Sequence, residues 1–270
     1  MFRRALNYFW LLLFLLAVSA RVPGQSVKPG AVDIDAIQRR ADTTFRLAFH
    51  FVALPDGRNF VRDPDDSLFL AHGRHEKLRA DVLMYYLFNE LNHRFRTALL
   101  DYPPSRDTKL RFTYAGDPAR PLESAHFYAH GERIRPVADA FNVVFTTHGR
   151  AGARGPDGAT TGTGSRTIYV YDRLQTYLAG SHDTWTVARL IGHELGHALS
   201  LDHTFKCDNP CAGQGFDPLE ECFGECTDHN GGSGRTNCFG GSPRELMMGY
   251  GSQLHLTVCE VERIWRYLLR

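Results

Sequence analysis

One short stretch of the chain, His193–His203 (HELGHALSLDH), constrains the fold more than any other. Residues four apart lie on one face of a helix with their Cβ atoms about 5–6 Å apart, so a helix would let His193 and His197 bind one ion. Imidazole nitrogens bind zinc at about 2.0–2.1 Å. Glu194 lies one step further round the helix, where it could reach a metal-bound water without being a ligand. The alternative is a polar helix whose histidines only form hydrogen bonds.

The third histidine requires the helix to end early. His203 lies six residues after His197, and a continuous helix would turn its side chain away from the other two. We expect the helix to break between Leu199 and Leu201, so that His203 completes a set of three ligands and leaves a fourth position open. Ser200 would then adopt a positive φ, which favours glycine and costs serine about 1 kcal/mol.

The stretch resembles the motif of the metzincin peptidases, H-E-x-x-H-x-x-G-x-x-H, with Ser200 in the place of the glycine. The resemblance implies that His193, His197 and His203 bind one zinc ion per chain. It also implies that Glu194 is the catalytic general base, taking a proton from the zinc-bound water and giving it to the leaving amine.

A second segment resembles the methionine turn of the metzincins. Glu245–Tyr250 (ELMMGY) would place Met248 beneath the metal, and ordinary core packing is the alternative for the methionine pair. By the same resemblance, Tyr250 is a candidate catalytic residue that stabilises the negative charge developing on the substrate.

The length of the link between these segments separates the metzincin families. From His203 to Met248 it spans 248 − 203 = 45 residues, far longer than in the matrixins, although LGHALSLDH is similar to a matrixin helix. H-T-F before a cysteine-bearing insertion, and M-G-Y before L-T-x-C, resemble the pappalysin family over about Thr184–Arg270. The resemblance implies an α/β (α+β) catalytic domain with a mixed twisted sheet, two long helices above the cleft and an irregular, disulfide-braced lower subdomain. It also implies a calcium site there, to which Asp228–Gly231 could contribute; a plain loop is the alternative.

All six cysteines follow the HELGH stretch: Cys207, Cys211, Cys222, Cys226, Cys238 and Cys259. An even number of cysteines in an exported chain predicts disulfides, whereas a second zinc site at the two C-x-x-x-C pairs is the alternative. We predict that Cys238 pairs with Cys259 across the methionine turn and that the other four pair among themselves.

The N-terminus predicts export. Two arginines precede the apolar run Phe9–Val18, which is shorter than the ~20 residues needed to span a bilayer, and small residues follow it. We interpret 1–20 as a signal peptide, 21–43 as a leader or short pro-segment and 44–270 as the catalytic domain; a membrane anchor is the alternative for the first segment. The expected location is extracellular, or periplasmic in a bacterium, without membrane association after signal cleavage.

Composition and periodicity favour a single α/β domain. A chain of 270 residues that is 43% hydrophobic can bury a substantial core, and a net charge of +1 gives no indication of a nucleic-acid partner. The oligomeric state stays open. The predicted strands are Thr44–Leu54, Lys109–Tyr114, Ala140–Thr146 and Thr167–Tyr171, and the predicted helices are Lys77–Leu100, Trp185–Ser200 and Val258–Leu269.

The sequence therefore predicts a secreted zinc-dependent endopeptidase that acts on a protein or peptide substrate. The glycine-rich stretch Gly149–Ser165 is expected to form a loop bordering the cleft, with the extended substrate pairing to an edge strand nearby. A flexible linker is the alternative for this stretch. The alternatives for function are an exported zinc-binding recognition module without catalysis, which Glu194 argues against, and a zinc hydrolase acting on a non-peptide amide.

Overall fold

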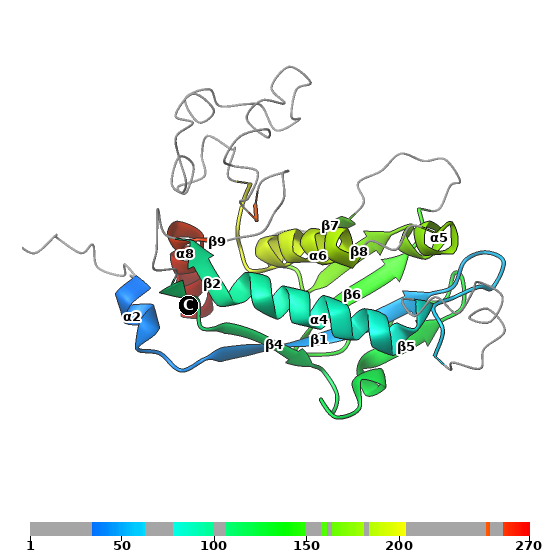
Figure 1. The fold of residues 1–270 in the computed structure, drawn as a ribbon, viewed down its shortest axis with the longest axis horizontal. Helices are drawn as coiled ribbons and strands as arrows, with labels where there is room; N and C mark the ends of the chain where they lie inside the picture. Colours follow the sequence, from blue (N-terminus) through cyan, green and yellow to red (C-terminus); the bar gives the residue numbers. More distant parts are fainter. Residues whose placement is uncertain are drawn as a thin grey trace, which may run out of the picture. The chain divides into compact units, whose positions relative to one another are not determined.

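A mixed sheet built around the strand β1 (Thr43–Val52) organises the computed structural model (Figure 1). The structure describes residues 34–62, 78–99, 106–148, 158–160, 164–180, 184–203, 247–248 and 256–270. The remaining strands of this sheet are β4 (Leu110–Tyr114), β5 (Ala125–Tyr128), β6 (Ala140–Thr146), β7 (Gly158–Thr160) and β8 (Thr167–Tyr171). Their order is β4-β1-β6-β8-β7, and β5 pairs with the second half of β1. All neighbours are parallel except β7, which runs antiparallel to β8.

Two long helices cover one face of this sheet. They are α4 (Ala80–Arg96) and α6 (Thr184–Ala198), which pack against each other (Figure 1). In α4 the buried apolar residues recur every four positions and form one stripe. This stripe consists of Leu83, Leu87, Leu91 and Phe95. It belongs to the same core as Leu47, Phe49 and Phe51, which alternate along β1 and so point to one face of the sheet.

On the other face of the sheet, Ile134 and Val137 of the covering segment 129–137 pack against strand residues, and this face contains a buried histidine. The ring of His50 donates from Nε2 to Asn142 Oδ1 at 2.8 Å, and its Nδ1 lies 3.1 Å from the Tyr128 hydroxyl. Asn142 Oδ1 also accepts from the main-chain N–H of Val137 at 2.7 Å, which joins the covering segment to the sheet. Burial lowers the pKa of His50 to about 4, so the ring is neutral in the folded protein.

A smaller sheet with the order β3-β2-β9 lies beside the C-terminal helix. Its strands are β2 (Thr97–Leu99), β3 (Arg106–Asp107) and β9 (Leu256–Thr257), and the helix is α8 (Val258–Leu268). Thr257 begins α8 with a capping box: its hydroxyl accepts from the Glu260 N–H at 3.1 Å, and the Glu260 carboxylate accepts from the Thr257 N–H at 2.7 Å. Cys259 of α8 is disulfide-bonded, and the five other cysteines lie outside the described residues.

The short helix α2 (Ile34–Gln38) packs against α8, although it lies in the segment predicted to be a leader. Ile37 is fully buried, and the Gln38 side chain donates to the main-chain oxygen of Asp107 at 2.6 Å. The helix belongs to the same compact unit as the rest of Val32–Arg270. The predicted signal peptide and most of the predicted leader lie outside the described residues.

The structure confirms the predicted α/β class and most of the predicted elements. β6 and β8 have the predicted bounds, and β1, β4, α6 and α8 agree within two residues at each end. The first long helix is shorter than predicted because the chain leaves it at Arg96 and continues as β2. The elements that were not predicted are short: α2, β2, β3, η2 (Pro121–Ser124), β5, β7, α5 (Arg173–Leu178) and β9. No helix among the described residues is both long enough and apolar enough to cross a bilayer.

Candidate metal centre

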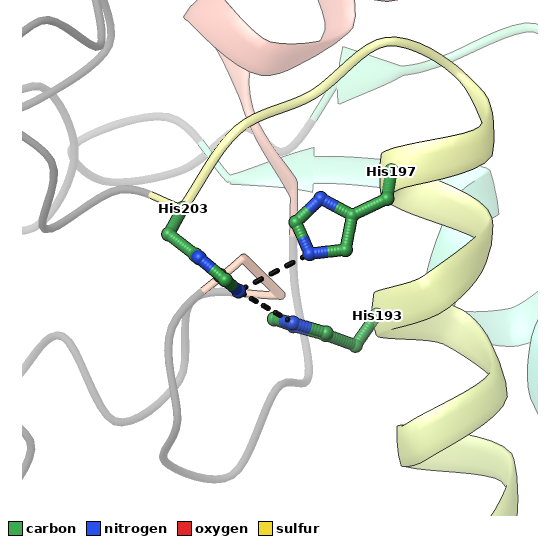
Figure 2. A group of neighbouring side chains, drawn as sticks. All are labelled: His193, His197 and His203. Atoms are coloured by element: carbon green, nitrogen blue, oxygen red, sulfur yellow. Dashed lines mark hydrogen bonds between the residues drawn. The ribbon is translucent and has the colours of Figure 1, made fainter. Parts of the chain in front are cut away.

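The helix α6 carries two of the three histidines. Its buried apolar residues Val187, Ile191 and Leu195 recur at helical spacing and fix one face of the helix in the core. His193 and His197 lie one turn apart near its C-terminus, and their rings point toward the same place (Figure 2).

The helix ends where the ligand geometry requires it to end. The N–H of Leu201 donates to the Gly196 oxygen at 2.9 Å, and the N–H of Ser200 donates to the His197 oxygen, also at 2.9 Å. This pair of bonds is a Schellman motif, whose turning residue is left-handed. That residue is Ser200, with a φ of 72°, so the predicted break and the positive φ are both confirmed.

The turn brings His203 back onto the other two histidines. Its Nε2 lies 3.1 Å from the Nε2 of His193 and 3.1 Å from the Nε2 of His197 (Figure 2). All three nitrogens lie within 4.8 Å of one another. The three side chains predicted to bind metal therefore meet at one point.

Main-chain oxygens orient two of the rings. His193 Nδ1 lies 2.8 Å from the Met247 oxygen, and His197 Nδ1 lies 2.9 Å from the Leu201 oxygen. A carbonyl oxygen can only accept, so each Nδ1 carries the proton and each Nε2 presents a lone pair. Burial, with repulsion from His197 as a smaller cause, lowers the pKa of His193 to about 4 and keeps that ring neutral. These are the tautomers that a metal ligand needs.

The donor set fits a metal ion. Lone pairs that converge at about 3 Å repel one another unless a proton or a cation lies between them. Three nitrogens bound tetrahedrally to one zinc ion would lie roughly 3.3–3.4 Å apart. This is close to the 3.1 Å that separates the His203 nitrogen from each of the other two. The His193, His197 and His203 group could therefore bind a metal ion.

Glu194 lies at the edge of the sheet and is only 7% exposed. Burial raises the pKa of its carboxyl group to about 7, and a hydrogen bond from the main-chain N–H of Thr160 opposes that rise. Thr160 belongs to β7, the antiparallel edge strand within the glycine-rich stretch. Glu194 is thus a buried carboxyl group that lies next to His193 in the sequence and contacts a sheet edge.

Met247 and Met248 are both fully buried in a turn. Met248 packs against Gly196 of α6, which lies between His193 and His197 in the sequence. The Met247 oxygen was not anticipated as the partner of His193. The predicted catalytic residue Tyr250 and the calcium candidate Asp228–Gly231 lie outside the described residues.

The groups that sequence reasoning missed are main-chain atoms. The Met247 and Leu201 oxygens and the Thr160 N–H act through the backbone, so no side-chain pattern could have indicated them. Comparison of the sequence with models of known protein families found no matching family, and comparison with curated proteins found no match.

Proposed function

We propose that the protein is a zinc-dependent endopeptidase. The observation that carries the proposal is the combination, on one helix end, of three converging histidine nitrogens and the buried carboxyl group of Glu194. Three imidazoles with an open fourth position are the usual donor set of a hydrolytic zinc site. A structural zinc site would more commonly have four protein ligands, and it would have no use for an adjacent carboxylate.

A zinc ion at this point would polarise the scissile carbonyl and lower the pKa of a water molecule there. The residues of the chain supply the remaining parts of the reaction. A Glu194 carboxylate oxygen accepts the proton that the water loses as its oxygen attacks the carbonyl carbon. The same oxygen then donates that proton to the amide nitrogen as the carbon–nitrogen bond breaks, so proton and charge balance over the cycle. Tyr250 is proposed to donate a hydrogen bond to the developing oxyanion.

The edge strand supports a peptide as the substrate. β7 pairs only with β8 among the described strands, so its outer side offers main-chain donors and acceptors beside Glu194. An extended peptide can add to such an edge as a further strand. This arrangement favours a polypeptide over a small amide and over a recognition module without catalysis.

The resemblance to metzincins, and to pappalysins in particular, remains part of the proposal. It is supported by the positive φ of Ser200, where the motif has glycine, and by Met248 beneath the histidine-bearing helix. Secretion, directed by 1–20, is proposed together with it.

Zinc content and casein digestion test the proposal. Purified protein should contain about one zinc ion per chain and should digest casein until a chelator is added. Glu194→Gln should lower the rate by at least ~10²-fold while zinc content stays at the wild-type level, because only the proton acceptor is lost. His203→Ala should lose the zinc.

A matched control uses a glutamate distant from the site. Glu123 is an exposed residue of η2 that pairs with Arg120, so Glu123→Gln should digest casein as the wild type does. Full activity in the Glu194→Gln protein would refute its role as base. Zinc binding without digestion of casein would instead leave a recognition module or a non-peptide hydrolase.

A further inference from the structure

A groove separates the N-terminal half of α4 from η2. Its volume is about 500 Å³, and its apolar walls consist of Val82, Tyr85 and Tyr86 from α4 and of Pro121 and Leu122 from η2. Ligand sites typically have volumes of about 300–1,000 Å³ and mostly apolar walls. Two of the five large hydrophobic side chains that are exposed among the described residues lie on one wall, since Tyr85 is 60% exposed and Tyr86 is 37% exposed. The groove is distinct from the histidine site, which lies at the C-terminal end of α6.

Both walls of the groove are fixed to the sheet. The opposite face of α4 is anchored in the core by Leu83 and Leu87, which are fully buried. On the η2 side, the main-chain N–H of Gly116 donates to the Ser124 hydroxyl at 2.7 Å. A Cβ atom at Gly116 would lie 2.9 Å from the Cβ of Glu123, so η2 approaches the end of β4 as closely as a glycine permits. The groove is therefore formed before any ligand binds.

One buried hydroxyl group beside the groove has no partner. Tyr114, the last residue of β4, is 6% exposed, and its ring stacks on Phe88 of α4 at 4.6 Å. Its hydroxyl forms no hydrogen bond within the described part of the chain. Burial raises the pKa of Tyr114 to about 12, and the groove residues Tyr85 and Asp81 lie close enough to add to the rise. A buried donor without an acceptor is costly, so a ligand that brings an acceptor oxygen to this hydroxyl gains binding energy.

The charged groups around the groove give it a small excess of negative charge. Asp81 pairs with Arg79 at 2.6 Å, while Arg120 pairs with Glu123 at 3.2 Å and lies 3.9 Å from Asp117. Three carboxylates thus surround two guanidinium groups. Ion pairs near the surface contribute only about 0–1 kcal/mol, so these groups can exchange partners with a ligand. The complementary ligand carries a positive charge beside its apolar part.

We propose that this groove binds a proline-rich segment of a partner polypeptide in the polyproline II conformation, with a lysine or arginine beside the prolines. Such a segment has no internal hydrogen bonds, so its carbonyl oxygens are free to accept from the tyrosine hydroxyls. Its pyrrolidine rings pack on aromatic walls, and its fixed φ lowers the entropy lost on binding. The proposal does not depend on the metal centre.

The other common modes of peptide recognition fit this groove less well. Addition of a strand requires an open sheet edge, whereas both walls here are helical. An amphipathic helix would bring apolar side chains, but its main-chain oxygens are bonded within the helix and cannot serve Tyr114. Recognition of a phosphate group uses clustered arginines. Of the described residues that line the groove, only Arg120 is an arginine, and it is already paired.

Binding of a labelled peptide tests the proposal. The full-length protein carries Glu194→Gln, so that the peptide stays intact whether or not the proposed function holds. The probe is a fluorescein-labelled polyproline peptide that ends in arginines, and binding is followed by fluorescence anisotropy. Three reference peptides have the same length: one replaces proline by glycine and serine, one replaces arginine by glutamate, and one is an amphipathic helix that keeps the arginines. We expect the probe to bind at least about five-fold more tightly than each reference.

Variants of the two tyrosines locate the binding site. Tyr85→Ala removes an exposed ring and should weaken binding of the probe at least about five-fold. Tyr114→Phe should weaken it about two- to ten-fold, the effect of one hydrogen bond, without lowering the melting temperature, because the hydroxyl has no partner in the described part of the free protein. The matched control is Tyr267→Ala, which removes an exposed tyrosine from α8 and should bind the probe as the parent does.

NMR of the methyl groups checks the location without any change to the groove. The signals of Val82 and Leu122 should shift when the probe is added, whereas those of Val187 and Ile191 in α6 should not. Equal binding of the probe and a reference peptide, tighter binding of the helical peptide, or unchanged binding in Tyr85→Ala would overturn the proposal. A loss of stability in Tyr114→Phe would also contradict it. None of these measurements requires turnover, so failure to digest casein would count against the proposed function alone.

Discussion

A Cβ atom on Gly196 would overlap the sulfur of Met248. Met248 is fully buried, so its side chain has little space into which it could retreat. The overlap explains why the residue just before His197 is a glycine, despite the cost of about 1 kcal/mol that glycine carries inside a helix. The contact joins two segments that are far apart in the sequence.

Gly196→Ala should therefore destabilise the protein, by about 1–3 kcal/mol, because the added methyl group forces Met248 to repack. Zinc affinity should fall as well, because Met247, next to Met248, supplies the main-chain oxygen that orients the His193 ring. Denaturant unfolding and zinc titration measure both effects. The matched control is Gly192→Ala in the same helix, where the nearest atom to an added Cβ lies 3.7 Å away.

Gly192→Ala should be neutral or stabilising, by up to ~1 kcal/mol, because alanine is the better helix former. Combining Gly196→Ala with Met248→Ala should recover part of the lost stability. If the two glycine variants behave alike, the contact with Met248 has no special importance.

Ser200 provides a second prediction, based on its left-handed backbone. Ser200→Gly removes the Cβ from a residue with a φ of 72° and should be neutral or stabilise by about 1 kcal/mol. Ser200→Val places a β-branched side chain there and should destabilise by about 1–3 kcal/mol. Thermal unfolding and zinc titration give the comparison. A marked loss of zinc affinity in the glycine variant would show that the serine hydroxyl is used.

The sequence predicted the elements whose periodicity reflects burial. β6, β8 and α6 are long or strongly apolar, so one face of each must be buried whatever the surroundings. It also predicted the three histidines, because their spacing has meaning only with a helix break between them. The break was predicted from the position of His203, although Ser200 stands where the motif has glycine.

The remainder depends on tertiary contacts. β7 consists of Gly158, Ala159 and Thr160, of which only threonine favours a strand. It is a strand because β8 and α6 lie beside it. The helix α2 has only five residues, two of them isoleucines, and its packing against α8 makes Ile37 a core residue. Neither neighbour can be inferred from the local sequence.

The buried histidine on the opposite face of the sheet predicts a pH dependence of stability. The pKa of His50 is lowered from 6.5 to about 4 on folding, so the unfolded chain binds the proton more readily. The contribution of neutral His50 to the free energy of unfolding is therefore fully present above about pH 6.5. It is lost as the pH falls from there toward 4. Its immediate aromatic neighbours are Tyr128 and His126, whose ring stacks on it at 4.9 Å.

His50→Gln should flatten the decline of the unfolding free energy between about pH 6.5 and 4, by up to ~1.4 kcal/mol per pH unit, the value for one proton. Urea unfolding across this range measures it. His126→Gln is the comparison variant and should flatten the curve less, because that ring is only partly buried. An unchanged slope in the His50 variant would mean that another group controls acid unfolding.

The cysteine pairing remains a prediction that a simple measurement decides. We expect the disulfide of Cys259 to join Cys238, closing a loop around the methionine turn and contributing on the order of 3 kcal/mol by loop entropy. Peptide mapping of the unreduced protein should recover that pair in one fragment. A fragment that links Cys259 to any of the first four cysteines would refute the pairing.

The packing of α2 against α8 sets a boundary for proteolytic maturation. If the N-terminal segment is trimmed after export, the cut must fall before Ile34, because removing Ile37 would open a hole in the core and expose α8. The segment predicted as a leader would then be divided between a part that can be discarded and a part that the mature enzyme retains. N-terminal sequencing of the exported protein would locate this boundary, and a mature chain starting after Ile34 would contradict it.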